Sequence, residues 1–488
     1  MNILLTSAGR RGYLCRYFKD ALHNSGKVFA ANSQYTQALT LADDYVITPL
    51  IFNPDYIPFL QKFVAKNQID VIIPLFDVDG YILSKEQERF AAQNVKIITG
   101  SLETLKICND KWASYKFFTE KKINTPRTFL SVDDCQKAIT TGEINFPVIV
   151  KPRWGMGSLG IYTAETPTEL EVFFQKLQRE IFTTYLKHES AQDKTHCVII
   201  QEKIIGDEFG LDVINDLNGN YVLTSAKRKL ALRAGETDVA ITVANPDLEE
   251  LGKQLSGSLQ YMANLDVDCF ISRQKIYVLE MNCRFGGQYP FSHLAGVRLT
   301  DQIVRWLNNE ATDLSLLTPK IGVLAGKEIT PVRFEFQTSM SVNGISLAIK
   351  KATHAELFDF YSRVSSDFSP PLLERVNMAD VAKKIVNAGI SIEGYSQGKL
   401  VGVVSGYAND FATAQAYINI VAVEKQFRKQ GIAKLLLQNF ITCVKCHGMK
   451  TILLKTDSNN TSAIALYKKM GFSITQKGAS KITLTLAL

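Results

Sequence analysis

The first hundred residues alternate short apolar stretches with longer amphipathic ones. The apolar stretches predict strands at residues 2–6, 28–32, 44–48, 71–74 and 96–99, and the periodicity of residues 13–25 predicts a helix after the first strand. Strand–turn–helix repeats of this kind are typical of a doubly wound parallel sheet. Ligands of such sheets bind at the carboxyl ends of the strands, which here carry residues 7–12 and 76–80.

Those two strand ends carry weak candidates for substrate binding. The turn at residues 7–12 lacks the G-x-G-x-x-G pattern, so it does not support a dinucleotide site. Its Arg10 and Arg11 either hold an anionic group of a substrate or lie on the surface of a tight turn. Asp77, in the second strand end, is the other candidate for contact with a substrate.

The next segment contains an apolar strand that ends in a lysine. Residues 146–152 read FPVIVKP, and a glycine-containing loop follows directly. Glycine lets the backbone N–H groups of such a loop approach phosphate oxygens closely. This combination favours binding of a nucleotide phosphate. The residues concerned are Lys151, Gly155, Gly157, Ser158 and Gly160.

Two later apolar strands carry hard oxygen ligands. Glu280 and Asn282 point to the same face of their strand because strand side chains alternate. If Asp268 lies on the antiparallel partner of a hairpin, it faces the same point, and three such ligands suit Mg²⁺ or Mn²⁺ bound together with nucleotide phosphates. Arg284, further along that face, can balance the charge of a transferred phosphoryl group. A surface hairpin with solvated acids is the alternative.

In this order, the pieces resemble the ATP-grasp fold over residues 106–310, preceded by a pre-ATP-grasp domain. The carbamoyl-phosphate-synthase-like ligases, including the pyrrolysine-biosynthesis type, are the most similar. The matching stretches are residues 109–111, the Lys151 strand and its loop, residues 202–208 and residues 280–284. Cys283 stands where most relatives have proline.

The resemblance implies a role for each matching residue. Lys111 and Lys151 would contact the phosphates of ATP, and the 155–160 loop would close over them. Glu202 and Glu208 would bind the adenine and the ribose. The metal would be bound by Asp268, Glu280 and Asn282. Arg228 and Arg233, in a basic stretch, would face a phosphate or the acyl substrate.

A different pattern begins at about residue 343. Strands are predicted at residues 393–396, 400–407 and 416–423, and a hairpin turn at 397–399 joins the first two. A basic, glycine-containing turn at 424–431 leads into a helix. The free N–H groups at the start of that helix, together with Arg428, can bind an anion.

That turn and residues 457–472 resemble the GNAT acetyltransferase family. The resemblance implies that the backbone after Arg428 holds the pyrophosphate of CoA, that Asn460 contacts the pantetheine arm and that Tyr467 protonates the leaving thiolate. A general base is not assigned, because Asn419 stands where some relatives place a carboxylate. The residues expected to bind CoA are Val423, Arg428, Gln430, Gly431, Ile432, Ala433 and Asn460.

The expected fold class is therefore a multidomain α/β protein. It comprises a Rossmann-like, parallel α/β pre-ATP-grasp domain at 1–105, an α+β ATP-grasp domain at 106–330, a linker at 331–342 and an α/β GNAT domain at 343–488. The length of 488 residues agrees, since it allows about three or four compact domains.

Composition limits the ligands and the cellular location that we expect. The net charge of +7 suits anionic substrates, but no basic stripe interleaved with aromatic residues favours nucleic acid. Neither a signal peptide nor an apolar run of about 18 residues is present, so we expect no membrane span. The 8 scattered cysteines indicate reduced thiols and a cytoplasmic location.

These patterns predict a bifunctional enzyme that acts on small molecules. One part would join a carboxylate to an amine through an acyl phosphate, with ATP and Mg²⁺, and the other would acetylate an amine from acetyl-CoA. Two alternatives stay open: a regulatory protein that senses ATP and CoA, and a ligase that acts on a carrier protein or peptide. A homodimer is the default expectation for the assembly.

Overall fold

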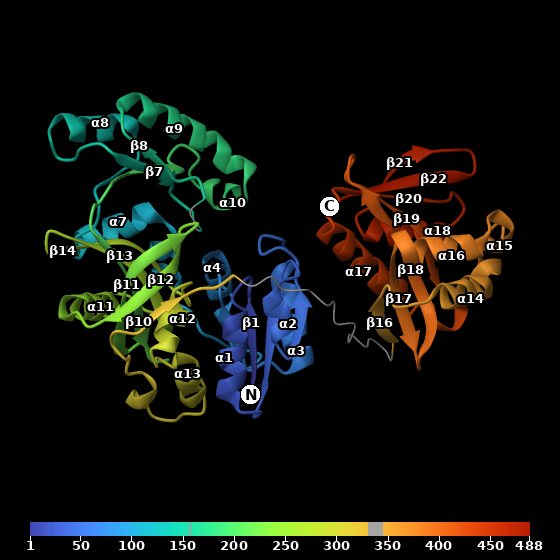
Figure 1. The fold of residues 1–488 in the computed structure, drawn as a ribbon, viewed down its shortest axis with the longest axis horizontal. Helices are drawn as coiled ribbons and strands as arrows, with labels where there is room; N and C mark the ends of the chain where they lie inside the picture. Colours follow the sequence, from blue (N-terminus) through green and yellow to red (C-terminus); the bar gives the residue numbers. More distant parts are fainter. Residues whose placement is uncertain (156, 158, 330–344) are drawn as a thin grey trace. The chain divides into compact units, whose positions relative to one another are not determined.

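The described residues of the computed structural model, 1–155, 157, 159–329 and 345–488, form four β-sheets (Figure 1). The chain divides into two compact units, Met1–Phe334 and Glu335–Leu488. The first unit holds three sheets and the second unit holds one. The linker predicted at 331–342 and the loop residue Ser158 lie outside the described residues.

The N-terminal sheet is parallel, as the strand–helix repeats predict. Its apolar strands are buried because helices cover both faces: α1 packs on one face, and α3 and α5 pack on the other. Helix α1 ends earlier than predicted because His23 takes up a left-handed conformation (φ 45°). In sheet order the strands are β3 (Asp44–Ile47), β2 (Lys27–Asn32), β1 (Asn2–Thr6), β4 (Val71–Pro74) and β5 (Lys96–Ile97); the helices are α1 (Gly12–Leu22), α2 (Gln37–Leu41), α3 (Tyr56–Asn67), α4 (Asp77–Ser84) and α5 (Gln87–Ala91).

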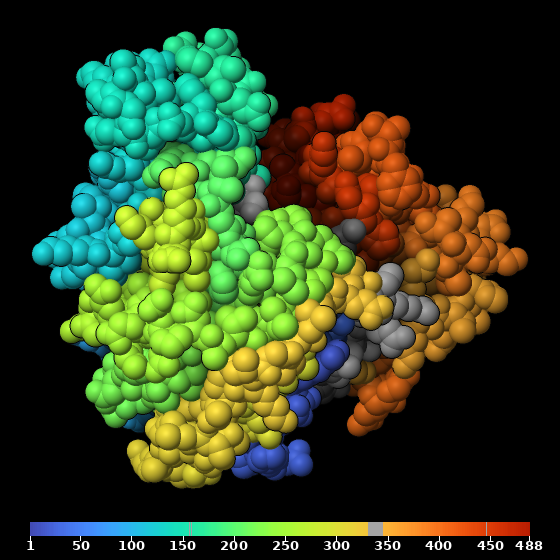
Figure 2. All heavy atoms as spheres, turned by 60° about the vertical axis from the view of Figure 1, so that its left-hand side comes forward, coloured from blue at the N-terminus to red at the C-terminus, as the bar shows by residue number. Residues whose placement is uncertain are grey.

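A second, antiparallel sheet belongs to a small lobe of residues 128–202. In Figure 2 this lobe, cyan to teal, forms a separate mass at the top of the first unit. Its apolar side chains make a core of their own against α8 and α9. The strands are β6 (Thr128–Phe129), β9 (Val198–Glu202), β7 (Val148–Pro152) and β8 (Tyr162–Ala164); the helices are α8 (Val132–Thr140), α9 (Pro167–Glu180), the single turn η1 (Ile181–Thr183) and α10 (Lys187–Ser190).

The largest sheet of the first unit is antiparallel and amphipathic. Its apolar face packs against α6, α7 and α11, and its other face is polar. In sheet order the strands are β14 (Lys275–Asn282), β13 (Ala263–Ser272), β10 (Asp207–Asn215), β11 (Tyr221–Arg233), β12 (Glu236–Val243) and β15 (Leu324–Gly326); the helices are α6 (Leu102–Asn109), α7 (Lys111–Glu120), α11 (Pro246–Ser258), α12 (Tyr289–Leu294), α13 (Leu299–Leu307) and the turn η2 (Leu314–Leu316).

The second unit is a mixed sheet covered on both faces. Helix α17 packs on one face, and α14 and α16 pack on the other. The strands, in sheet order, are β16 (Ile345–Ile349), β17 (Ile390–Ser396), β18 (Lys399–Asp410), β19 (Gln415–Val423), β20 (Thr451–Asp457), β22 (Lys481–Ala487) and β21 (Ser473–Lys477); the helices are α14 (His354–Val364), η3 (Ser365–Asp367), α15 (Leu372–Arg375), α16 (Met378–Ala388), η4 (Lys425–Phe427), α17 (Ile432–Cys446) and α18 (Thr461–Lys469). In the described residues, no helix is long and apolar enough to span a membrane.

Candidate functional site

The hairpin predicted from the sequence is present at the edge of the largest sheet. Strands β13 and β14 pair antiparallel, with Asp268 opposite Glu280 and Asp266 opposite Asn282. A bulge beyond Asp268 shifts the register, so that Val278 and Met281 both reach the apolar core. The polar face of the hairpin therefore presents three carboxylates and one amide side by side.

Two lysines approach this hairpin from other elements. Lys111 is the first residue of α7, which begins there because the Asp110 side chain caps it. Its Nζ donates to the Gly155 carbonyl and lies 3.5 Å from Glu280 Oε2. Burial, together with the charge of Lys111, lowers the pKa of Lys151 to about 8, while Glu280 opposes that shift. Lys111, the buried Lys151 and the partly exposed Glu280 thus lie in one neighbourhood.

Lys229 on β11 is a third lysine at the site, and the sequence reasoning missed it. Its Nζ lies 2.7 Å from both Glu208 Oε1 and Asp268 Oδ1. Burial alone would lower the pKa of Lys229, but the charges of Asp268 and Glu208 raise it. Burial raises the pKa of Asp268, against the opposing effect of Lys229 and with added repulsion from Asp266. Excess negative charge on the hairpin is therefore only partly compensated.

Strand alternation explains which basic residues reach the site. Lys229 and Arg228 are consecutive, so they point to opposite faces of β11. Arg228 is exposed and pairs with Asp207 (2.7 Å), and Arg233 pairs with Asp238 (2.7 Å) near the end of the strand. The structure thus does not bring Arg228 or Arg233 to the polar hairpin.

Arg284 connects the hairpin to the N-terminal domain. Its guanidinium lies 2.6 Å from Asp266 Oδ2 and 3.2 Å from Asp77 Oδ1, and all three side chains are buried. Asp77 reaches this point from the start of α4, which follows the carboxyl end of β4. The two carboxylates neutralise Arg284, so less positive charge is free there than the sequence suggested. Arg10, by contrast, is exposed.

The remaining predicted nucleotide residues surround the same lobe. The Glu202 carboxylate, at the end of β9, accepts a hydrogen bond from Arg127 N (3.1 Å). In the loop after β7, Gly157 and Gly160 have positive φ (64° and 72°), a backbone conformation that residues other than glycine rarely adopt. A Cβ at Gly160 would lie 2.7 Å from Leu177. This loop therefore depends on glycine for its shape.

A buried ion pair lies deeper on the same face. Lys227 Nζ is 2.5 Å from Asp212 Oδ2, and both side chains are fully buried. Ser292 donates to Asp212 (2.6 Å), as does Asn264 (2.9 Å). Lys227 also donates to Ser292 (2.8 Å), so both members of the pair have hydrogen bonds beyond the ion pair, as a buried ion pair needs to be tolerated.

The turn that the sequence predicts before α17 is present in the second unit. Gly431 caps the helix with a positive φ of 82°. Arg428 donates through Nε to the Val423 carbonyl (2.8 Å) and pairs with Asp367. Strand β19 pairs with β20 only from Gln415 to Ile418. On the side that faces β20, the backbone groups of the later β19 residues therefore form no ladder hydrogen bonds with that strand.

Tyr467 lies on helix α18 of the same unit, and Asn460 directly precedes that helix. Tyr467 is 7% exposed, and burial raises its pKa to about 12, so the phenol keeps its proton at neutral pH. The Asn460 side chain accepts from Ala463 N (3.2 Å) and caps the helix.

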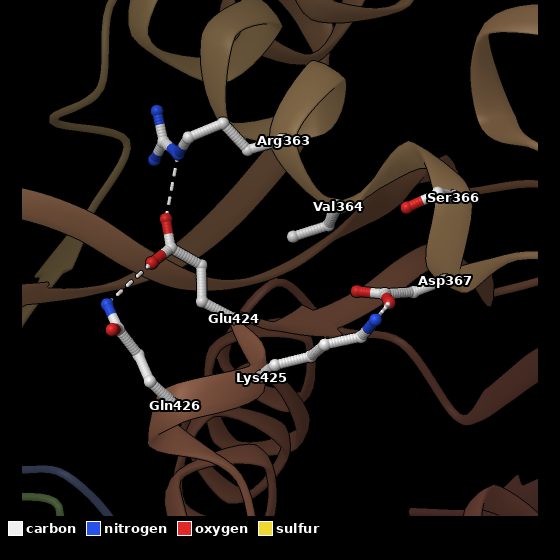
Figure 3. Close-up of a pocket in the computed structure, with 7 residues that line it drawn as sticks. All are labelled: Arg363, Val364, Ser366, Asp367, Glu424, Lys425 and Gln426. Atoms are coloured by element: carbon white, nitrogen blue, oxygen red, sulfur yellow. Dashed lines mark hydrogen bonds and ion pairs between the residues drawn. The ribbon is translucent and has the colours of Figure 1, made fainter.

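Beside the turn lies a cavity of about 320 Å³ (Figure 3). Arg363 and Glu424 form an ion pair across it (2.7 Å). Its lining residues are Arg363, Val364, Ser366, Asp367, Glu424, Lys425 and Gln426. Among the residues that the structure describes, no group of three or more His, Cys, Asp or Glu side chains is arranged to hold a metal ion.

Family models match three parts of the chain. Residues 3–98 match the PylC-like N-terminal domain, residues 108–288 match the ATP-grasp domain and residues 355–472 match the acetyltransferase (GNAT) family. The resemblances and the α/β multidomain fold class predicted from the sequence are confirmed.

Individual relatives are distant. The carbamoyl phosphate synthase large chain of Thermotoga neapolitana is 26% identical over 46% of this chain and 20% of its own length. The first relatives matched are covered over 20% to 36% of their length. Two solved structures share the fold: the L-amino acid ligase of Bacillus licheniformis (18% identity, TM-score 0.53, 68% of this chain and 81% of that one) and the Hydrogenobacter thermophilus 2-oxoglutarate carboxylase biotin carboxylase domain with MgADP (17%, 0.50, 62% and 69%).

Proposed function

We propose that this chain, whose central part is an ATP-grasp domain and whose C-terminal part is a GNAT domain, is a bifunctional enzyme. The first unit joins a small carboxylate to an amine, using ATP and Mg²⁺ and forming ADP and phosphate. The second unit transfers an acetyl group from acetyl-CoA to an amine.

One observation carries the ligase proposal: Lys111 and Lys151 converge on Glu280 of the acidic hairpin. Lysines that crowd a carboxylate suit a ligand that carries both a metal cation and several phosphate charges. The solved fold neighbour that contains MgADP agrees with a nucleotide of this kind. Glu208, which shares Lys229 with Asp268, is proposed to bind the ribose, and Glu202, at the end of β9, is proposed to bind the adenine.

The donor set fits Mg²⁺. Asp268, Glu280 and Asn282 offer hard oxygen atoms on one face, and ATP phosphates would supply further ligands. After desolvation, repulsion from Asp266 and Glu280 contributes to the raised pKa of Asp268, which Lys229 opposes. A divalent cation would relieve that repulsion. When bound, it would also offset negative charge on the transferred phosphoryl group.

The chain's own residues would then act by position and charge. Lys111 and Lys151 hold the ATP phosphates in line with the substrate carboxylate, whose oxygen attacks the γ-phosphorus and releases ADP. The acyl phosphate formed has a more electrophilic carbonyl than the carboxylate had. The amine attacks this carbon, and phosphate leaves with the electron pair of the C–O bond. Lys229 and Arg284 fix the carboxylates of the hairpin in place.

The acetyltransferase proposal rests on the turn before α17 and on Tyr467. The backbone N–H groups from Gln430 to Ala433 would bind the CoA pyrophosphate at the helix start. The part of β19 beyond Ile418, which pairs with β18 but not with β20, would hydrogen-bond the pantetheine arm. Tyr467, protonated at neutral pH, is suited to donate a proton to the leaving thiolate.

A direct test of the first activity uses pools of carboxylates and amines with ATP and Mg²⁺. Release of ADP and phosphate should require one pool of each kind and should vanish in Glu280→Gln. The matched control is Glu171→Gln, the same change at an exposed position on α9, which should keep the activity. Nucleotide release that Glu280→Gln leaves intact would refute the assignment of the site.

A further inference from the structure

A segment of the lobe between α9 and β9 is fixed to two other parts of the first unit. The His188 ring of α10 stacks on Phe52, which follows β3 of the N-terminal sheet (4.2 Å between ring centroids). Further along, Asp193 accepts from Arg153 Nη1 (3.2 Å), and Arg153 makes a two-pronged pair with Asp110. The segment 181–197 therefore spans from the N-terminal sheet to the start of α7.

Glu189, in the middle of this segment, is a buried carboxylate without a counter-ion. It is 8% exposed, and no hydrogen bond or ion pair to its carboxylate is present within the described parts of the chain. The Glu189 carboxylate interacts electrostatically with three groups from other elements: Asp77, Lys111 and Asp110.

Each of those three groups already has a partner of opposite charge. Asp77 pairs with Arg284, Lys111 pairs with Glu280, and Asp110 pairs with Arg153. Glu189 is left to pair with a ligand. A buried carboxylate that lacks a partner is costly, so a positively charged ligand is the chemistry that would satisfy it.

The surroundings also set its protonation. Burial, then repulsion from Asp77 and Asp110, raise the pKa of Glu189 to about 7, while Lys111 opposes that shift. Tyr185 of the same segment interacts electrostatically with Glu189 and Asp77, which, after its own burial, raises the pKa of the Tyr185 phenol. A carboxylate that titrates near neutral pH is suited to accept a proton in catalysis.

We propose that Glu189 binds the amine substrate of the ligase as its ammonium ion and removes the proton that prevents attack. This inference rests on the proposed ligase function. One N–H bond of the ammonium breaks, and its proton passes to a carboxylate oxygen of Glu189. The freed lone pair forms the C–N bond with the acyl phosphate, phosphate leaves with the C–O electron pair, and the second proton lost by nitrogen leaves with the phosphate.

The test compares two nucleophiles on one enzyme. Hydroxylamine is largely uncharged at neutral pH, so it can trap the acyl phosphate as a hydroxamate without a base. In Glu189→Gln, amide formation at pH 7 should fall by about a hundredfold, while hydroxamate formation should stay within about twofold of wild type. Glu171→Gln should change neither rate. Equal loss of both products, or loss of neither, would overturn the proposal.

The wild-type protein gives a second, independent readout. The rate of amide formation should rise with pH up to about 7, as Glu189 loses its proton, whereas the rate of hydroxamate formation per concentration of uncharged hydroxylamine should not. Matching pH profiles for the two products would refute the role of Glu189 even if Glu189→Gln did not fold. Absence of hydroxamate from wild type with every carboxylate pool would instead refute the proposed ligase function itself.

Discussion

Lys151 makes ATP binding dependent on pH in a direction that the structure sets. The ordinary pKa of this side chain is 10.5, and burial together with Lys111 lowers it to about 8. A shift of this size means that protonation of Lys151 in the free protein is roughly 3 kcal/mol less favourable than protonation of a lysine side chain in water. Phosphate groups bound beside it would repay that cost, so ATP binding should draw a proton onto Lys151.

The direction and the size of the pH dependence of ATP affinity follow from the pKa of Lys151. Below pH 8 the ammonium form predominates and ATP affinity is at its full value. As the pH rises through 8, the neutral form must take up a proton first, and the affinity falls. We expect the dissociation constant of ATP to rise about tenfold between pH 7 and pH 9, with uptake of about half a proton per ATP at pH 8.

Calorimetric titration with ATP in buffers of different ionisation enthalpy measures both quantities. Lys151→Met, neutral at every pH, should bind ATP more weakly and without this dependence. Lys176→Met, at a half-exposed position on α9, should keep the wild-type dependence. A wild-type affinity that is constant from pH 7 to pH 9, or a full dependence retained in Lys151→Met, would refute the reasoning.

Three further changes test other parts of the account. Glu280→Ala should lower Mg²⁺-dependent ATP turnover by at least about a hundredfold and spare acetyl-CoA binding, which an isotope-exchange assay and a CoA titration would show. Asp212→Ala leaves Lys227 buried and unpaired, so chemical denaturation should report a loss of about 3–5 kcal/mol in the stability of the first unit; a loss below about 1 kcal/mol would mean that water reaches the pair. Tyr467→Phe should slow acetyl transfer about a hundredfold without weakening CoA binding, and an unchanged transfer rate would remove Tyr467 as the acid.

Much of the architecture could be predicted from local sequence. The strand predicted at residues 2–6 is β1, and the alternation of apolar and polar residues around Glu280 predicts the face that the hairpin presents. These features are local, because strand periodicity and a hairpin register are set by neighbouring residues.

Long-range charge pairing could not be predicted in this way. Arg284 and Asp77 are 207 residues apart, and their ion pair neutralises a residue that the sequence presented as free positive charge. Lys229 could have been found from strand alternation, since it shares a face with Lys227 and not with Arg228. The sequence around Glu189 contains no pattern that indicates a site, because its lack of a partner depends on ion pairs between residues of four other elements.

The most direct test of the central claim follows an oxygen atom through the reaction. A carboxylate substrate labelled with heavy oxygen, found with the pools described above, is incubated with the protein, ATP, Mg²⁺ and the amine, and the phosphate released is analysed by mass spectrometry. Ligation through an acyl phosphate predicts one heavy oxygen in each phosphate released, in wild type and in Glu171→Gln. Phosphate that carries only unlabelled oxygen would contradict the acyl phosphate, and binding of ATP with no phosphate released from any pool would favour a sensor of ATP instead.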